Sequence, residues 1–578
     1  MMERRWAIHF GKGIFVLVWA LPIALASYAV WKHYVPVPFY DEWNTPGAEL
    51  ASWYRGTLNF AELCSQHNES RLLFPRLIYL PLCLPAGWDA RQEMALLLGV
   101  VCFLWAALYR LVRATIRSTT RAHIAFSVMN LLLFSPRQYE SFLCGNQWLT
   151  FFPALALICA TLVNLSGRSL RWKTICNGVF ALVSTYTFVN GMALWVLAFP
   201  IDTAAANASG SPRPSKFYWR IAYVVAAGVS IGCYFFSYQR PPTVPPLASF
   251  SPRLFQFFLI WLGSLFTVPN PSVVGAVVLL LFLVLAAIAV WLAVRNRDWR
   301  PHYPWLLLGT YALASDAATA IGRVGFGLEM AGDFRYAVFS VMLYIAIVGL
   351  AWTVYQQLNG RPSLKSAGRI LGAICAAVVL TLWASTYKAE RRVLKNFTEY
   401  RSHVLLLVRW ADAIPQNPEL AWISPFPETP GVIHTLAKHD ALRPRFVGKE
   451  LARAVAEIPK TESAAAGVLE EAAPDGMGRL VIKGWARLPD KERPADCIVL
   501  GLLKDERWQL RWVLGTGDKR SDVAQRFGTA ALERAGFSRP LFAPNLPTNA
   551  ASVRAWAIDL QNERAFPLVG EINIGPAP

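Results

Sequence analysis

Two acidic residues follow the first long apolar segment and are the leading candidates for chemistry. Asp41 and Glu42 lie in the run VPFYDEWNTPG, Val37–Gly47, shortly after the apolar stretch Gly13–Trp31. A carboxylate at the edge of an apolar environment is partly desolvated, which makes it a stronger base. The spacing therefore predicts that one of these two carboxylates takes a proton from a reacting hydroxyl group.

Four arginines elsewhere in the chain are candidates for binding a phosphate group. Arginine suits phosphate because its planar guanidinium gives two parallel, charge-assisted hydrogen bonds. The alternative is that these arginines pair with neighbouring carboxylates, which holds loops together, or extend toward lipid headgroups. The four candidates are Arg71, Arg76, Arg323 and Arg335.

Further polar and aromatic residues surround these candidates in the same segments of the sequence. Tyr40 and Trp43 flank the acidic pair and offer faces on which a sugar ring stacks. The other side chains expected to contact a substrate are polar. They are His67, Asn68, Glu69, Glu140, Asn146, Gln147 and Asn190.

The composition identifies a membrane protein with many helices. The chain has 578 residues, of which 55% are hydrophobic and only 16% charged. A bilayer core about 30 Å thick needs roughly 20 apolar residues per helix. Eight long apolar stretches and three shorter ones, Ala122–Phe134, Thr174–Phe188 and Gly191–Pro200, predict an all-α domain with about eleven transmembrane helices.

The distribution of positive charge indicates orientation and argues against a nucleic-acid partner. The net charge is +19, but the basic residues form short clusters between apolar stretches and no continuous patch. Placing these clusters in the cytoplasm obeys the positive-inside rule if Leu72–Leu84 and Leu254–Val268 do not cross. The N-terminus is then cytoplasmic and the C-terminus extracytoplasmic. All the candidate residues then lie on the outer side.

The chain is predicted to have three parts: a transmembrane domain over 1–389, an extracytoplasmic connecting segment over 390–465, and a small β-sandwich over 466–578. Residues in the last part alternate between β-branched or aromatic types and polar types, with Gly, Pro and Asp between the stretches. The predicted strands lie at 479–488, 497–504, 508–515, 552–559 and 564–570.

Several motifs together resemble the GT-C class of integral membrane glycosyltransferases, and more narrowly a bacterial polytopic group of this kind. They are YDEW at Tyr40–Trp43, HNESRLLFPRL at His67–Leu77, QYESFLCGNQ at Gln138–Gln147, STYTFVNGMALW at Ser184–Trp195, GRVGFG at Gly322–Gly327 and DFRY at Asp333–Tyr336. The resemblance implies transfer of a sugar from a polyprenyl-phosphate donor to a glycan or lipid-linked acceptor, outside the bacterial cytoplasmic membrane. It implies Asp41 as general base, with Glu42 as the alternative base, a helper, or a ligand of a metal or a hydroxyl group.

The phosphate-binding role of the arginines comes from their charge and position and is not a signature of that class. No cofactor is expected, and the single adjacent pair Asp41 and Glu42 gives little support for a divalent metal. The expected partners are the lipid-linked sugar donor, the acceptor and membrane lipids. Two other functions remain open: a transporter or flippase for a lipid-linked sugar, and a non-catalytic protein of envelope polysaccharide assembly.

Overall fold

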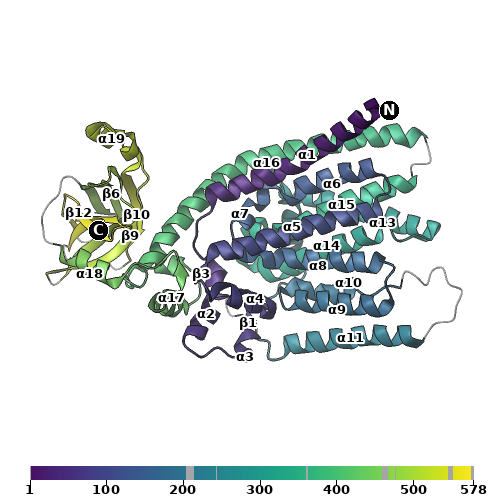
Figure 1. The fold of residues 1–578 in the computed structure, drawn as a ribbon, viewed down its shortest axis with the longest axis horizontal. Coiled ribbons are helices and arrows are strands. Elements are labelled where there is room, and N and C mark those ends of the chain that lie inside the picture. Colours follow the sequence, from purple (N-terminus) through teal and green to yellow (C-terminus); the bar gives the residue numbers. More distant parts are fainter. Residues whose placement is uncertain are drawn as a thin grey trace. The chain divides into compact units, whose positions relative to one another are not determined.

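A computed structural model describes residues 2–202, 214–241, 244–358, 362–458, 466–475, 477–504, 506–544 and 551–574. The chain divides into two compact units, which are described separately below (Figure 1). Unit 1 comprises residues 1–34, 59–79 and 91–396. Unit 2 comprises residues 35–58, 80–90 and 397–578.

Unit 1 is almost entirely helical. Its elements are α1 (Met2–His33), α3 (Phe60–Leu63), β1 (Gln66–His67), β2 (Ser70–Arg71), most of α5 (Ala90–Thr115), α6 (Thr119–Leu133), η2 (Pro136–Gln138), α7 (Tyr139–Phe142), η3 (Gly145–Gln147), α8 (Trp148–Leu165), α9 (Leu170–Thr185), η4 (Val189–Ala193), α10 (Leu194–Leu197), α11 (Pro214–Phe235), α12 (Pro252–Gly263), α13 (Pro271–Asn296), α14 (Tyr303–Arg323), η6 (Val324–Phe326), η7 (Leu328–Gly332), η8 (Phe334–Tyr336) and α15 (Ala337–Leu358). Three helices cross the division between the units: α4 (Leu73–Cys83), α16 (Pro362–Trp410) and, by its first residue Ala90, α5.

The helices of unit 1 identify a membrane protein. Within the described ranges, five helical stretches are long and apolar enough to cross a bilayer: Phe15–His33, Ala90–Thr115, Gly145–Leu165, Pro271–Asn296 and Ala337–Leu358. This is fewer than the eleven crossings expected from the sequence. The remaining expected crossings also form helices or helical turns. One of them, Ile370–Ser385, lies within α16, and some of its side chains are outside the described residues.

The two stretches expected not to cross are short helices. The first, α4, has 11 residues with Pro81 inside it, and α12 has 12 residues. At 1.5 Å per residue, each reaches only about 18 Å, which is well short of a bilayer core.

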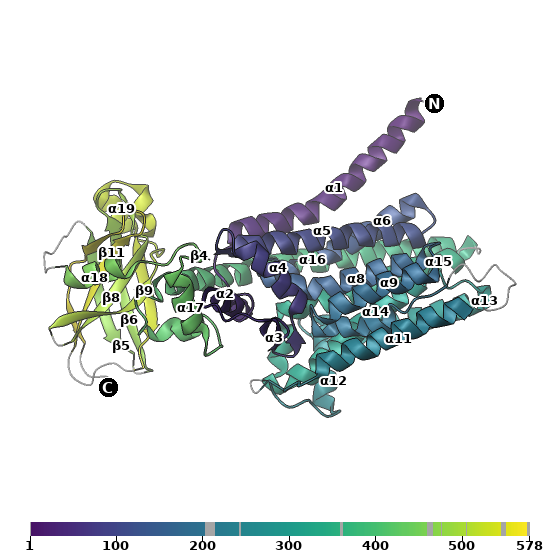
Figure 2. The same cartoon turned by 60° about the horizontal axis from the view of Figure 1, so that its bottom comes forward.

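The shortest expected crossing, Gly191–Pro200, is not a long helix but still runs back along α9. Gly191 packs against Ser184 near the end of α9, whereas the carbonyl of Ile201 accepts a hydrogen bond from Lys173 Nζ at 3.1 Å, near its start. Asn177 donates to the carbonyl of Ala198 at 2.8 Å. Irregular backbone inside a helix bundle requires such partners, because an unsatisfied carbonyl is costly there. Figure 2 shows α9 flanked by α11, which packs on it.

Glycines let α12 and α13 approach closely. A Cβ on Gly263 would lie 1.8 Å from the carbonyl oxygen of Pro271, and a Cβ on Gly275 would lie 1.9 Å from that of Leu259. Neither distance is physically possible, so both positions require glycine. Small residues at helix contacts are a common way to pack helices in membrane proteins.

Unit 2 combines two segments from the first part of the chain with its last third. Its helices and short strands are η1 (Tyr40–Trp43), α2 (Gly47–Tyr54), β3 (Trp88–Asp89), η9 (Pro418–Trp422), α17 (Thr429–Lys438), β4 (Leu442–Arg443) and α18 (Lys449–Glu457). Strand β3 pairs with β4 in parallel, and α2 packs on α17. The domain boundary expected at 389/390 falls inside the continuous helix α16. The domain boundary expected at 465/466 adjoins residues 459–465, which are outside the described ranges.

The C-terminal region is rich in β-strands, as the sequence predicts. It contains β5 (Gly467–Pro474), β6 (Arg479–Leu488), β7 (Arg493–Pro494), β8 (Cys497–Lys504), β9 (Arg507–Leu514), α19 (Ser521–Phe527), η10 (Ala530–Arg534), β10 (Gly536–Phe542), β11 (Ala551–Asp559), β12 (Arg564–Pro567) and β13 (Ile572–Ile574). One antiparallel sheet has the order β10-β6-β5, with β7 beside β6. The other has the order β12-β11-β8-β9, with β13 beside β11.

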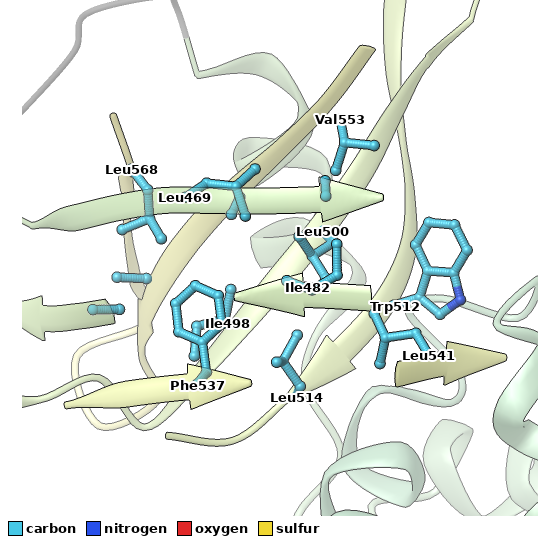
Figure 3. Packing of buried hydrophobic residues seen from close by; sticks show 14 of the residues in the cluster. Leu469, Ile482, Ile498, Leu500, Trp512, Leu514, Phe537, Leu541, Val553 and Leu568 are labelled. Atoms are coloured by element: carbon cyan, nitrogen blue, oxygen red, sulfur yellow. The ribbon is translucent and has the colours of Figure 1, made fainter. Parts of the chain in front are cut away.

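The two sheets share one hydrophobic core, seen in Figure 3. Ile482 from β6 and Phe537 from β10 represent the first sheet, and Leu500 from β8 and Trp512 from β9 represent the second. Each of these side chains is at most 2% exposed. Burial on one face of each strand is the physical basis of the alternating pattern in the sequence.

Candidate functional site

The acidic pair Asp41 and Glu42 lies in the short helical turn η1 of unit 2, where the two carboxylates have different environments. Glu42 is 1% exposed, and its Oε2 accepts a hydrogen bond from the backbone N–H of Phe39 at 2.6 Å. Asp41 is half-buried. Within the described part of the chain, its carboxylate accepts no hydrogen bond and forms no ion pair. Glu42 therefore holds the turn together, whereas the carboxylate of Asp41 is available to a ligand.

The backbone of this turn is strained directly before Asp41. Tyr40 has φ of 45°, a left-handed conformation that is rare for an aromatic residue. Such conformations persist only where surrounding contacts enforce them, and they concentrate at functional sites. One such contact is the hydroxyl of Ser424, which donates to the carbonyl of Tyr40 at 3.3 Å.

Residues distant in the sequence hold the turn in place. The guanidinium of Arg401, which is 2% exposed, donates to the carbonyls of Val35 and Val37 and lies 5.1 Å from the ring centre of Phe39. After the turn, Asn44 Nδ2 donates to Glu428 Oε1 at 2.8 Å. These contacts fix the chain on both sides of Asp41, so the position of its carboxylate is predefined.

The aromatic neighbours of Asp41 have different exposures. Trp43 is fully buried and packs edge-on against Trp88, with ring centres 5.4 Å apart. Tyr40 is 37% exposed, and its ring lies 4.7 Å from that of Phe39. Of the two aromatic residues expected to contact a sugar, only Tyr40 therefore presents a surface to a ligand.

In unit 1, Glu69 and Arg323 form a two-pronged ion pair. Arg323 Nη1 lies 2.8 Å from Glu69 Oε1, and Nη2 lies 3.0 Å from Oε2. Glu69 belongs to the connection between β1 and β2, while Arg323 ends α14. The backbone carbonyl of Glu69 also accepts from the hydroxyl of Tyr234 at 2.6 Å. The pair therefore links two segments that the sequence analysis assigned to the same side of the membrane.

Arg71 and Arg76 bind backbone carbonyls. Arg71 donates to the carbonyls of Tyr234, Cys64 and Phe236. Arg76, which is 2% exposed, donates to the carbonyls of Glu62, Leu63 and Ser65. These contacts hold the loops together, but through backbone carbonyls and not through the carboxylate partners or lipid headgroups of the alternative interpretation. They also occupy donors that a phosphate would need.

A second charged cluster in unit 1 contains Arg335, the fourth arginine candidate. Arg335 bonds Asp333 through Nε and Nη2, with the shortest distance 2.7 Å. Nearby, Arg137 pairs with Glu390 at 2.8 Å and donates to the carbonyl of Gly332, directly before Asp333. The charges in this cluster are thus mostly compensated.

Glu140 adds a titratable group to this second cluster. It lies on the short helix α7 and is 7% exposed. Burial, reinforced by the negative charge of Glu390, raises the pKa of Glu140 to about 7, and the positive charge of Arg137 opposes the increase. Glu140 therefore changes its charge near neutral pH, which is a property of groups that exchange protons with a substrate.

The remaining predicted contact residues are in unit 1. His67 is 8% exposed, with its Nε2 3.4 Å from Asn68 Nδ2. Asn146 and Gln147 belong to η3 and Asn190 to η4. Among the described residues, no hydrogen-bond partner is found for the buried atoms Gln147 Oε1 and Asn190 Nδ2. Unpaired buried polar atoms of this kind are ready to bind water or a polar ligand.

Glu390 and Arg401, two residues that organise these sites, were not predicted from the sequence. Both lie on α16, beyond the last apolar stretch, in a region that was interpreted as a connecting segment. The signal available in the sequence was the helical continuation of that stretch into LKNFTEYRSHVLLLVRW.

Within the described ranges, no three His, Cys, Asp or Glu side chains are grouped as metal ligands would be.

Comparison with known proteins adds no relative: no family model, curated protein or solved structure matches the chain.

Proposed function

We propose that this protein is a membrane glycosyltransferase that transfers one sugar from a polyprenyl-phosphate donor to an extracytoplasmic glycan or lipid-linked acceptor. The observation that carries the proposal is the environment of Asp41. Its carboxylate is half-buried and unbonded within the described residues, and it follows a strained residue. Its neighbour Glu42 is committed to the backbone. A preorganised and unengaged carboxylate is what a general base requires.

In the proposed reaction, Asp41 accepts the proton of an acceptor hydroxyl as its oxygen attacks the anomeric carbon. The bond between that carbon and the phosphate oxygen breaks, and polyprenyl phosphate leaves with the bonding electrons. Direct displacement inverts the configuration at the anomeric carbon. The step needs no redox partner, and the leaving phosphate carries negative charge, which arginine side chains stabilise.

Arg323 and Arg335 are the preferred donor-binding arginines. Each is bonded mainly to a carboxylate side chain, Glu69 or Asp333, that a phosphate oxygen can replace with the same geometry. Arg71 and Arg76 are engaged by backbone carbonyls. We assign those two to holding the loop in place.

The proposed topology has eleven crossings, with the N-terminus in the cytoplasm and the C-terminal β-rich region outside the bacterial inner membrane. Two contacts support it. The first is a hydrogen bond between two predicted outer segments: the N–H of Val189 donates to Ser70 Oγ at 3.2 Å. The chain also returns along α9 between Gly191 and Ile201, as a crossing there requires.

The test is a transfer assay with purified protein in lipid nanodiscs and a panel of polyprenyl-phosphate sugars. Donor consumption by the wild type is expected for at least one member. Asp41→Asn should reduce the rate by about 100-fold or more, because a positioned base contributes about 10²–10⁴-fold. The thermal midpoint of unfolding should stay unchanged.

Glu62→Gln is the matched control, since Glu62 is another half-buried carboxylate in the first predicted outer loop. It should retain the wild-type rate. Full activity of Asp41→Asn would exclude Asp41 as the base. Failure of the wild type to consume any donor of the panel, with acceptor-containing membrane extract present, would contradict the transferase function.

A further inference from the structure

A carboxyl group that the proposed function does not use is buried within the helices of unit 1. Asp316 lies on α14 and is 0% exposed. Its Oδ2 is 3.5 Å from the hydroxyl of Ser340 on α15, and its Oδ1 has no hydrogen-bond partner among the described residues. Ionisable residues inside membrane helices are costly, and their presence points to a function.

Ser340 only partly satisfies Asp316. The hydroxyl of Ser340 has one proton, and it also lies 3.2 Å from the carbonyl oxygen of Trp261. This second contact is the shorter one, so the proton is shared at best. The carboxyl group of Asp316 therefore lacks the full set of hydrogen bonds that a buried charge requires.

No positive side chain compensates Asp316 within the described part of the chain. Its electrostatic environment there consists of burial and the Ser340 contact, without Lys, Arg or His. An ionised carboxylate without a counter-charge in such surroundings costs several kcal/mol at least. The group must therefore bind either a proton or a metal cation.

Several buried oxygen atoms lie on the same helices as Asp316 and Ser340 or contact Ser340. Besides Ser340 Oγ, they include the hydroxyls of Tyr311 and Ser315, which neighbour each other and are buried without a well-formed hydrogen bond to any described residue. The carbonyl of Trp261 belongs to the last turn of α12, a helix of 12 residues, where it also accepts from the N–H of Ser264 at 3.2 Å and from its hydroxyl at 2.9 Å. The C-terminal end of a helix carries partial negative charge, which attracts cations.

We propose that Asp316, Ser340 and the carbonyl of Trp261 form a binding site for a sodium ion. Oxygen-only ligands suit hard cations, and helix C-terminal carbonyls coordinate Na⁺ in several membrane proteins. One carboxylate neutralises one monovalent cation, whereas a divalent ion would leave an uncompensated positive charge inside the bundle. The site is independent of the proposed transferase reaction.

The test is thermal unfolding of the detergent-solubilised full chain at neutral pH, with NaCl, KCl or choline chloride at equal ionic strength. A ligand that binds only the folded state raises the midpoint in a saturable manner. The midpoint should rise by several degrees with sodium and remain at the choline value with potassium. Binding of radioactive ²²Na⁺ should reveal one saturable site.

Asp316→Asn should remove both the sodium-dependent shift and ²²Na⁺ binding. Asp298→Asn, in the loop before α14, is the matched control and should retain both. Ser340→Ala should raise the sodium concentration needed for half the shift by about tenfold, which is the loss expected for one ligand of the site. This second variant keeps the test decisive if Asp316→Asn does not fold.

Two results would overturn the proposal. Equal midpoints in sodium, potassium and choline would mean that Asp316 is simply a protonated acid that bonds Ser340. Persistence of sodium binding in Asp316→Asn would place the ion elsewhere.

Discussion

Arg323 and Glu69 are separated by 254 positions in the sequence, yet their side chains meet in two parallel bonds of 2.8 and 3.0 Å. The pair joins the end of α14 to the connection between β1 and β2. Both side chains are partly exposed, at 17% and 28%. Water therefore screens the attraction in part, and its contribution to stability is moderate.

A double-mutant cycle measures that contribution. Glu69→Gln and Arg323→Gln should each destabilise unit 1, and the double variant should be more stable than the sum predicts, by about 1 kcal/mol. Denaturant unfolding followed by tryptophan fluorescence gives the free energies. As a control, Glu62→Gln combined with Arg323→Gln should be additive, because these residues share no contact. Additivity in the Glu69 cycle would show that the pair does not contribute to stability.

The two carboxylates of the Asp41 turn should differ in their effect on stability. Glu42→Ala removes the acceptor of the Phe39 N–H group and should cost about 1–3 kcal/mol. Asp41→Ala removes a side chain without bonds to the described residues and should change stability by less than about 0.5 kcal/mol. The same unfolding measurement compares the two variants. If Asp41→Ala were the more destabilising change, the structural role would belong to Asp41.

Glu140 predicts a specific pH dependence. Burial and Glu390 raise the pKa of Glu140 from 4.5 to about 7, so the folded state holds a proton that the unfolded state has already lost in this range. The contribution of Glu140 to stability is therefore lost as pH rises from about 4.5 to about 7. Glu140→Gln stays neutral, so its thermal midpoint should fall less over this window.

The control for Glu140 is Glu329→Gln, which changes an exposed carboxylate on η7. Its midpoint should follow the wild-type curve throughout. A Glu140→Gln curve parallel to that of the wild type would mean that Glu140 titrates at its ordinary value.

The close contact of α12 and α13 should not tolerate an added methyl group. Gly275→Ala would place its Cβ 1.9 Å from the carbonyl oxygen of Leu259, so the helices must separate. A loss of about 1–3 kcal/mol is expected, as for other overpacked interiors. Gly228→Ala on α11 is the matched control, because nothing lies within 4 Å of the added Cβ. Equal thermal midpoints for the two variants would contradict this packing.

Some of the architecture follows from the sequence because it depends on local patterns. Apolar stretches such as Val273–Val294 become helices wherever water is excluded, since a helix satisfies its own backbone groups. The alternating stretches 479–488 and 497–504 coincide with β6 and β8, because period two places one set of side chains in the core. The expected eleven crossings remain a proposal, since length and composition identify only five candidates among the described residues.

Other features could not be predicted, because they depend on which distant segments meet. The sequence treats Arg323 and Arg71 alike, whereas the structure gives one a carboxylate partner and the other three carbonyls. Arg401 was not singled out at all, yet it holds the backbone before Asp41. Asp316 was counted only as part of an apolar stretch, and its isolation becomes visible only once α12 and α15 surround it.

The sequence by itself determined that the chain is a helical membrane protein with a β-rich C-terminal region. Hydrophobicity and its period are local properties, and they require no knowledge of contacts. It also identified the YDEW turn, and the resemblance to a known class ranked Asp41 before Glu42 as the base without showing how their environments differ. The tertiary structure decided their environments: Glu42 is buried against the backbone of Phe39, whereas Asp41 is half-buried and has no bonding partner among the described residues. Burial and hydrogen bonding depend on the surroundings of each side chain in the folded protein. These surroundings differ between Asp41 and Glu42, although the two residues are adjacent and carry the same charge.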